Sequence, residues 1–383
     1  MKSLEHTRES PSLVYVVGTR PNFVKTAPVI AAMKERLPDA RHVLVHTGQH
    51  YDREMSELFF DELGLAPPDH MLDVGSGTHG AQTGRALERI EQVLLEERPD
   101  AVVVPGDVNS TLAAALAAVK LEIDVAHIES GLRSFDRSMP EEINRVLVDQ
   151  VARWCFIHSG EAAENLRREG VPPEHVFFVG NTMIDTLVRM RPLVERSDAL
   201  ERLGLKQGEY VLVTLHRPAL VDGELFPAVL EGLRRLSKVL PVVYPMHPRS
   251  RARLDGAIAG DERLHLVDPV GYIDFLALQM GSAGVITDSG GVQEETTWLR
   301  IPCFTLRENT ERPVTLHQGT NRLLGLDPVA VARLPELLGG SVVPLAPPPG
   351  WDGHAGERLA DVLSEALGGV SDEPGPARAD RSI

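Results

Sequence analysis

The segment DSGGVQEE, residues 288–295, brings a hydroxyl and two glycines together directly ahead of a glutamine and two acids. It follows the apolar run AGVIT and precedes TTWLRIP, so the glycines are expected where a strand ends and a helix begins. The first helical turn exposes unpaired backbone N–H groups, and glycine lets an anion approach them. Ser289, Gly290 and Gly291 therefore predict a phosphate site. A tight turn in which Ser289 only caps the helix is the alternative.

A second candidate anion site lies in GTRPNFVK, residues 18–25. Pro21 suits the first turn of a helix, with Arg20 just before it and Lys25 about one turn later. Positive charge at a helix N-terminus is unfavourable unless an anion lies there. Arg20 and Lys25 thus predict a second phosphate contact, facing the first across a cleft, although either side chain alone could simply be solvated.

Proton-exchanging side chains follow several apolar runs: Asp107 in PGDVNS, Glu129 in HIESGLRS, Glu141 in MPEEINR and His216 in TLHRP. Carboxylates grouped near anion-binding donors indicate general acid and base chemistry.

Each of these residues also has a purely structural interpretation. Asp107 could cap a helix that begins near Ser110, and His216 could be a strand-end histidine with its hydrogen bonds satisfied. The acids could form ion pairs three or four residues along the chain. The pairs would be Glu129 with Arg133, and Glu141 and Glu142 with Arg145.

Short apolar runs that alternate with helical patterns must position these side chains. Six such runs precede residue 180 and five follow residue 209: LVYVVG, HVLVH, AVVVPGD, DVAHIE, WCFI and VFFVG, then YVLVTLH, PVVYPMH, LHLVD, GVITD and IPCFTL. Continuous apolar strands separated by helices predict parallel sheets covered on both faces, which bind ligands at the carboxyl ends of their strands. We expect an α/β protein with domains at 12–188 and 189–355, a helix at 356–368 that packs back on the first domain, and a disordered tail at 369–383.

The composition of the chain limits the classes of protein to which it can belong. The chain has 383 residues, 43% hydrophobic and 25% charged, which is typical of a two-domain globular protein. It has no apolar stretch of membrane-spanning length and a polar N-terminus, so we expect a cytoplasmic protein with no membrane partner. The net charge of −16 argues against nucleic acid as a partner. Cys155 and Cys303 lack metal-ligand spacing and are expected to be buried and reduced.

A nicotinamide cofactor is not expected. GSGTHG fits the dinucleotide fingerprint through Gly75, Gly77 and Gly80, but its strand would be only MLDV. The acids about 20 residues on, Glu96 and Glu97, fall inside a helical pattern. The NAD-dependent sugar-nucleotide epimerases use a Tyr-x-x-x-Lys pair, and none of the five tyrosines has a lysine four residues later.

Seven ordered segments between about residues 13 and 325 resemble motifs of the non-hydrolysing UDP-N-acetylglucosamine 2-epimerases. They are GTRPNFVKTAPVI, TGQH, GDVNSTLAAALAA, HIESGLRSFDRSMPEEINR, VGNTMIDTL, DSGGVQEE and TERPVTLHQGT. The resemblance implies the glycosyltransferase-B architecture, in which two Rossmann-like domains face each other across a cleft, with neither NAD nor a metal. It also implies cell-envelope polysaccharide synthesis, UDP-N-acetylglucosamine and UDP as ligands, and a homodimer.

The resemblance assigns roles by motif position. Arg20 and Lys25 would lie near the phosphates, and Glu295 would bind the ribose hydroxyls. The diphosphate would be held by Ser289, Gly290, Gly291 and Arg312. Catalysis would fall to Asp107, Glu129, Glu141 and His216.

One segment of the sequence differs from the family pattern, and several alternative functions stay open. Where the family often reads HRREN or HRAEN, this chain has HRPAL, so Pro218, Ala219 and Leu220 lack the usual polar groups. Gln49 and His50 match a region that helps to bind a second, activating substrate molecule in many bacterial members. A relative acting on another UDP-sugar such as a diacetamido-uronic acid, a hydrolase releasing N-acetylmannosamine, a glycosyltransferase and a pure binding module remain alternatives.

Overall fold

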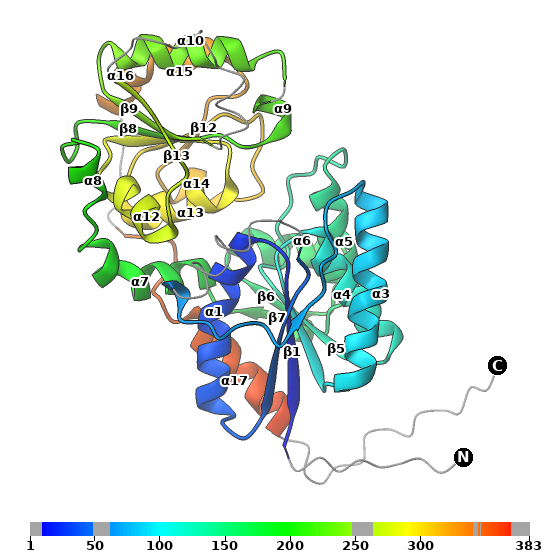
Figure 1. Cartoon of the computed structure of the whole chain (residues 1–383). Coiled ribbons are helices and arrows are strands. Elements are labelled where there is room, and N and C mark those ends of the chain that lie inside the picture. The colour runs from blue at the N-terminus through cyan, green and yellow to red at the C-terminus, as the bar shows by residue number, and fades with distance from the viewer. Residues whose placement is uncertain are drawn as a thin grey trace, which may run out of the picture.

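Two parallel sheets, each covered by helices, form the two units of the molecule (Figure 1). The computed structural model describes residues 10–48, 62–221, 223–246, 263–339, 344 and 346–368. Gln49, His50 and the tail at 369–383 lie outside the described residues. Within the described part of the chain, no helix is long and apolar enough to cross a membrane.

The first unit contains a seven-stranded sheet in the order β3-β2-β1-β4-β5-β6-β7. Its strands are β1 (Ser12–Val17), β2 (Arg41–His46), β3 (His70–Met71), β4 (Ala101–Pro105), β5 (Asp124–Ile128), β6 (Trp154–Ile157) and β7 (Val176–Phe178). Its helices are α1 (Arg20–Arg36), α3 (His79–Glu97), α4 (Asn109–Lys120), α5 (Pro140–Val151), α6 (Gly160–Arg168), the 3₁₀ turn η1 (Pro173–His175) and α7 (Thr182–Val194).

The second unit repeats this design with a six-stranded sheet in the order β10-β9-β8-β11-β12-β13. Its strands are β8 (Val211–Thr214), β9 (Val242–Pro245), β10 (Leu264–Val267), β11 (Gly284–Thr287), β12 (Cys303–Thr305) and β13 (Asn321–Leu323). The remaining helices are α8 (Ala199–Arg202), α9 (Pro218–Val221), α10 (Phe226–Ser237), α12 (Tyr272–Gly281), α13 (Gly290–Leu299), α14 (Val314–His317), α15 (Pro328–Ala332), α16 (Leu334–Gly339) and α17 (Ala355–Gly368).

The predicted fold class is therefore confirmed: the two units are Rossmann-like and have the glycosyltransferase-B arrangement. All eleven apolar runs form strands, and every strand pair in the described residues is parallel. The strand order reverses between β1 and β4 in one sheet and between β8 and β11 in the other. Such reversals open a crevice at the carboxyl ends of the strands. Cys155 and Cys303 are buried and unpaired, as predicted.

The last helix, α17, returns to the first unit and packs against α1 and α7 (Figure 1). Its buried residues Leu359, Ala360 and Leu363 join the apolar core around α1. Asp185, on α7, accepts hydrogen bonds from the backbone N–H groups of Ala355 at 3.1 Å and Gly356 at 2.6 Å. These are orphan donors of the first turn of α17, so Asp185 fixes where the returning helix begins.

We expect Asp185→Ala to lower the free energy of unfolding by about 1–2 kcal/mol, because it leaves two buried N–H groups at the start of α17 without an acceptor. Equilibrium urea denaturation followed by circular dichroism measures the change. Asp361→Ala, on the exposed side of the same helix, is the control and should leave the unfolding curve in place. Equal curves for both variants would show that Asp185 does not hold α17.

Candidate active site

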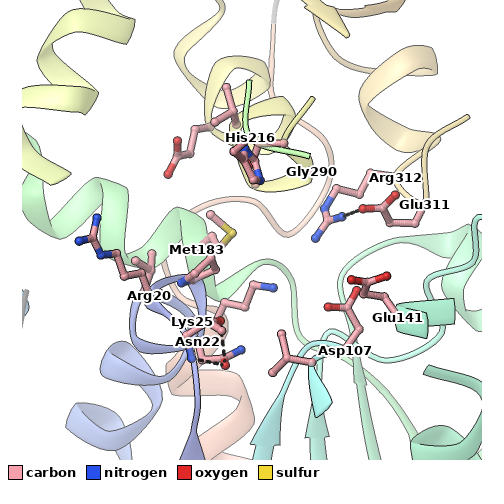
Figure 2. A pocket seen from close by; sticks show the side chains of 18 of the residues that line it. Arg20, Asn22, Lys25, Asp107, Glu141, Met183, His216, Gly290, Glu311 and Arg312 are labelled. Atoms are coloured by element: carbon pink, nitrogen blue, oxygen red, sulfur yellow. Dashed lines mark hydrogen bonds and ion pairs between the residues drawn. The ribbon is translucent and has the colours of Figure 1, made fainter. Parts of the chain in front are cut away.

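A cavity of about 310 Å³ lies at the carboxyl ends of both sheets, where the two strand orders reverse. Each strand next to a reversal contributes to its wall: Arg20 and Lys25 follow β1, Asp107 follows β4, His216 follows β8, and Ser289 follows β11. Glu141, Gly290, Gly291, Glu295 and Arg312 complete the predicted residues in the wall. Figure 2 shows Lys25, Asp107 and Glu141 on one side of the cavity and His216, Gly290 and Arg312 on the other.

A second cavity, of about 400 Å³, opens beside the first and shares Arg20, His216, Tyr272 and Phe275 with it. Its other lining residues are mostly apolar: Thr214, Leu215, Val221, Pro245, Met246, Pro269, Val270 and Gly271. The neighbouring spaces thus differ in character, one rich in charge and the other suited to a flat, weakly polar group.

The N-terminus of α13 forms one wall of the first cavity. Ser289 occupies the N-cap position, but its side chain makes no capping hydrogen bond, so the interpretation of Ser289 as only a helix cap is wrong. A Cβ at Gly290 would lie 2.3 Å from Nη1 of Arg312, and one at Gly291 would lie 2.9 Å from the terminal methyl of Met183. The two glycines therefore make room for Arg312 and Met183 in this structure, while the first helical turn still faces the cavity.

Arg312 is buried among three carboxylates. Its Nε lies 3.1 Å from Glu294, its Nη2 lies 2.7 Å from Glu129, and its Nη1 contacts Glu311. Burial opposes the charged form of the guanidinium, but these carboxylates hold the pKa of Arg312 well above its usual value. The guanidinium is fixed at the cavity wall by protein anions.

Glu311 anchors a wider group of arginines. It lies 2.6 Å from Nη2 of Arg307 and 4.0 Å from nitrogens of Arg145 and Arg217. This buried carboxylate thus gathers four guanidinium groups, of which those of Arg145, Arg217 and Arg312 line the cavity.

Glu129 lies just behind the cavity wall, between Lys25 and Arg312. Burial would raise the pKa of Glu129, but these two cations hold it below the usual glutamate range. The alternative pairing of Glu129 with Arg133 is wrong, since Arg133 instead binds Asp149 at 2.7 Å and Glu169 at 2.5 Å.

Helix α5 positions Asp107. Nε and Nη2 of Arg145 lie 2.9 and 2.6 Å from Oδ2 of Asp107, and Nδ2 of Asn144 donates to its backbone oxygen at 2.8 Å. Val108, not Asp107, occupies the N-cap of α4, so the capping interpretation of Asp107 is also wrong.

The two neighbouring acids of α5 have different environments. Glu142 is buried, lies 2.5 Å from Nη1 of Arg145, and accepts from the backbone N–H groups of Ser134 and Phe135, each at 2.9 Å. Glu141 instead lines the cavity. The predicted ion pair with Arg145 thus belongs to Glu142, and Glu141 faces the space where a ligand would lie (Figure 2).

Asp288 orients His216. Its Oδ1 lies 3.0 Å from Nδ1 of His216, and its carboxylate accepts the backbone N–H groups of His216 and Arg217 at 2.9 and 2.8 Å. Burial would raise the pKa of Asp288, but its hydrogen bond with His216 holds it below the usual range. With Nδ1 directed at Asp288 and 61% of its side chain exposed, His216 can present Nε2 to a ligand.

Glu295 lines the cavity in a less polar place. Its carboxyl accepts hydrogen bonds from the hydroxyl of Tyr272 at 2.9 Å and from Nε2 of Gln279 at 2.7 Å. Burial raises the pKa of Glu295 to about 7, although these two donors act against the shift. Each of its oxygens still has a lone pair for a further donor.

Among the described residues, Glu129, His158 and Glu294 form the group whose spacing could hold a metal, with ligand atoms within 4.8 Å of one another. Lys25 and Arg312 already contact these carboxylates, so a divalent ion would meet two nearby positive charges. We therefore assign the two acids to the ion-pair network.

The dinucleotide fingerprint has no structural support. The segment with Gly75, Gly77 and Gly80 follows β3, a two-residue strand at the sheet edge, not a strand at the reversal. A Cβ at Gly77 would lie 3.0 Å from Nη2 of Arg85, which donates to the oxygen of Ser76 at 3.0 Å. Gly75 and Gly77 lie in the segment between β3 and α3, and Gly80 lies in the first turn of α3.

Several residues of the site were not predicted from the sequence: Arg145, Arg217, Asp288 and Glu311. All four stood in motifs already singled out: Arg145 in MPEEINR, Arg217 in TLHRP, Asp288 in DSGG and Glu311 in TERP. Their closeness in sequence to predicted site residues was the signal that could have identified them.

Comparison with known proteins gives consistent results. The model of the family UDP-N-acetylglucosamine 2-epimerase matches residues 31–364. The UDP-N-acetylglucosamine 2-epimerase of Methanocaldococcus jannaschii is 41% identical over 363 residues, which cover 92% of this chain and 98% of that protein. A crystal structure of that organism's enzyme in complex with UDP-GlcNAc and UDP superposes with a TM-score of 0.84 at 40% identity, covering 92% and 99% of the two chains. The UDP-2,3-diacetamido-2,3-dideoxy-D-glucuronate 2-epimerase of Pseudomonas aeruginosa is 42% identical over 318 residues, or 82% and 88% of the two chains.

The raised pKa of Glu295 predicts a pH-dependent contribution to stability. Its folded pKa of about 7 lies above the usual glutamate value, so the contribution is complete below about pH 4.5 and is lost as the pH rises through 7. Relative to Glu295→Gln, the wild type should lose on the order of 2–3 kcal/mol of unfolding free energy between pH 5 and pH 8.

Urea denaturation of both proteins across this pH range measures the difference. Glu336→Gln, at an exposed glutamate, should track the wild type at every pH. A constant difference between the wild type and Glu295→Gln would mean that Glu295 is already ionised throughout.

Proposed function

The chain belongs to the UDP-N-acetylglucosamine 2-epimerase family, and we propose that it interconverts UDP-N-acetylglucosamine and UDP-N-acetylmannosamine. One observation carries the proposal. The cavity brings an anion-binding helix end and Arg312 of the second unit opposite the carboxylates of Asp107 and Glu141 of the first. Hydrolysis or transfer of a UDP-sugar needs the anion-binding helix end and Arg312. Inversion at carbon 2 of the sugar also needs side chains that remove a proton and return one.

We propose that the diphosphate lies at the first turn of α13, where the N–H groups of Gly290 and Gly291 and the hydroxyl of Ser289 are donors. Glu295, one turn further, is suited to accept the ribose hydroxyls through its remaining lone pairs. The neighbouring apolar cavity would take the uracil ring. This order places the sugar towards Asp107 and Glu141.

The reaction proposed is an elimination followed by re-addition. The bond from carbon 1 to the UDP oxygen breaks, a proton leaves carbon 2, and a 2-acetamidoglucal forms; UDP then returns and a proton arrives on the opposite face. A hydrogen on carbon 2 is too weakly acidic for a carboxylate unless positive charge builds at carbon 1 as UDP leaves. Stabilisation of the departing diphosphate must therefore accompany deprotonation.

The ion-pair network offers a way to couple these two events. In the unliganded protein Glu129 is held between Lys25 and Arg312, which lowers its basicity. A diphosphate that attracts either cation would loosen that hold, so Glu129 would become a stronger base when the leaving group is bound. Lys25 and Arg312 would then bind the phosphates and also set the basicity of Glu129.

Proton transfer on two faces requires at least two groups. Asp107 and Glu141 approach the cavity from the first unit, and His216 approaches from the second. We propose that the carboxylates exchange protons with carbon 2, while His216, oriented by Asp288, protonates or neutralises the departing phosphate.

Other UDP-N-acetyl sugars remain candidate substrates, because a relative of similar identity is named for a diacetamido-glucuronate. Incubation with UDP-N-acetylglucosamine alone, followed by proton NMR, separates the activities. Epimer supports the proposal, and free N-acetylmannosamine would indicate hydrolysis. No reaction until an acceptor is added would indicate a glycosyltransferase. The division at residue 188, the homodimer, the cytoplasmic location and the activator role of Gln49 and His50 stay predictions.

The neighbouring acids of α5 provide a matched pair of variants. Glu141→Gln keeps the shape of a side chain that faces the cavity but removes its proton exchange, so kcat should fall about 100-fold or more with unchanged unfolding free energy. Glu142→Gln breaks a buried ion pair and should lower the unfolding free energy by about 3 kcal/mol. Assays with UDP-N-acetylglucosamine and urea denaturation of both variants give the comparison. Near-normal turnover in Glu141→Gln would remove that residue from the mechanism.

The mechanism itself predicts an isotope pattern. In heavy water, deuterium should enter carbon 2 of the product, because the hydrogen lost there and the one gained exchange with solvent through different groups. An oxygen-18 label in the bridging position should scramble into non-bridging oxygens if the diphosphate rotates before re-addition. Mass spectrometry and NMR detect both changes, along with traces of free UDP and 2-acetamidoglucal. Product that retains protium at carbon 2 would contradict the elimination.

A further inference from the structure

A buried histidine–aspartate pair lies beneath the turns that carry two of the proposed catalytic acids. Nδ1 of His127 lies 2.7 Å from Oδ1 of Asp149, and Nε2 of His127 lies 2.7 Å from the backbone oxygen of Gly106. His127 is on β5 and Asp149 is on α5, and the side chains of both are completely buried. Because both ring nitrogens face oxygen acceptors, the imidazole is clamped at its two ends.

The contact at Nε2 reaches the turn of Asp107. Gly106, whose oxygen accepts from His127, adopts the left-handed conformation with φ +64° and directly precedes Asp107. Gly106 also donates its N–H to the oxygen of Ile128 at 3.0 Å, which ties the turn to the neighbouring strand. The direction in which Asp107 leaves the sheet therefore depends on a backbone oxygen held by His127.

The contact at Nδ1 leads to the turn of Glu129. Oδ2 of Asp149 accepts the N–H of Gly131 at 3.0 Å and lies 2.7 Å from Arg133. Glu129 itself has φ +70°, a conformation that non-glycine residues adopt only where their surroundings hold them. Asp149 supplies part of that hold two residues further along the same turn.

The negative charge of Asp149 maintains its contact with His127. Burial alone would raise the pKa of Asp149, but His127 and Arg133 beside it hold that pKa below the usual aspartate range. The ionised carboxylate can then accept from His127, Gly131 and Arg133 at once.

We propose that His127 and Asp149 are positioning residues which hold the Gly106–Asp107 turn and the Glu129–Gly131 turn in one fixed relation. Neither residue lines the cavity, so both act through the acids that they position. The inference rests on the proposed function, because it assigns the two residues to the proton transfers at carbon 2.

Two substitutions separate the two contacts. The amide nitrogen of glutamine extends as far from the backbone as Nε2 of histidine, and that of asparagine extends as far as Nδ1. His127→Gln can therefore keep the bond to Gly106 and lose the bond to Asp149, while His127→Asn does the reverse. Both remove the ring, so they lose similar packing.

The experiment measures kcat, KM for UDP-N-acetylglucosamine and calorimetric UDP affinity for both variants and for the wild type. His127→Asn should lower kcat about 100-fold, since small misplacement of a reacting group has effects of that size. His127→Gln should retain kcat within about tenfold of the wild type. KM and UDP affinity should change less than about threefold in both, because the nucleotide is proposed to bind the second unit.

Val125→Ala is the control for general loosening of the core. Val125 is fully buried on the same strand, two residues before His127, and its side chain contacts neither turn through a hydrogen bond. It should lose stability yet keep kcat. If His127→Asn and Val125→Ala lower kcat alike at matched stability, or if His127→Asn turns over normally, the positioning role is refuted.

Asp149→Asn gives a second test that does not depend on the histidine. It keeps the size of the side chain but cannot accept from His127 and Arg133 together with Gly131 as an anion does, so kcat should fall about tenfold or more with UDP affinity retained. Normal kcat in this variant would also refute the proposal. A wild-type protein inactive on UDP-N-acetylglucosamine that binds UDP would instead refute the proposed function and leave the turn geometry to be tested by a crystal structure of His127→Asn.

Discussion

The ion pair between Arg312 and Glu129 joins the two units of the molecule at the centre of the site. Arg312 belongs to the second unit and Glu129 to the first, and their side chains meet at 2.7 Å while almost fully buried. A buried ion pair adds little net stability over an apolar contact, but removing either partner leaves an unpaired buried charge. His158 of the first unit makes a second such approach, 3.2 Å from Glu294. Any opening of the cleft must therefore solvate these charges or give them other partners.

Helix α5 explains why the acids of the first unit form one group. Its successive turns direct Glu141 into the cavity, Arg145 onto Asp107, and Asp149 onto His127 and Gly131. The turns after β4 and β5 are thus braced by the same helix. A rotation or shift of α5 would alter all of these contacts together, which makes the arrangement of the acids a property of one packed element.

The sequence predicted the strands and the residues at their ends well, because buried parallel strands are continuous apolar runs and their carboxyl ends meet at one edge. It missed β3, His70–Met71, and β13, Asn321–Leu323, whose short sequences carry no such pattern. The predicted pair of Glu142 with Arg145 is present within α5, but that of Glu129 with Arg133 is wrong, because the rule of three or four residues applies only within helices. Glu129 lies in a turn, and its partners Lys25 and Arg312 are 104 and 183 residues away in the chain. Only the fold reveals such pairs.

The internal carboxylates also set conditions on the ligand. Arg312 is already satisfied by Glu129, Glu294 and Glu311, so an incoming anion must compete with protein groups that are held in place. A diphosphate brings two negative charges, and the N–H donors of α13 favour it. A neutral sugar has no charge with which to replace the carboxylates that pair with Arg312. Displacement of a carboxylate also offsets part of the binding free energy, because that carboxylate must find a new partner or a proton. In the proposed elimination, in which UDP leaves the sugar and returns within each cycle, part of the binding free energy would be used to raise the basicity of Glu129, not only to hold the nucleotide.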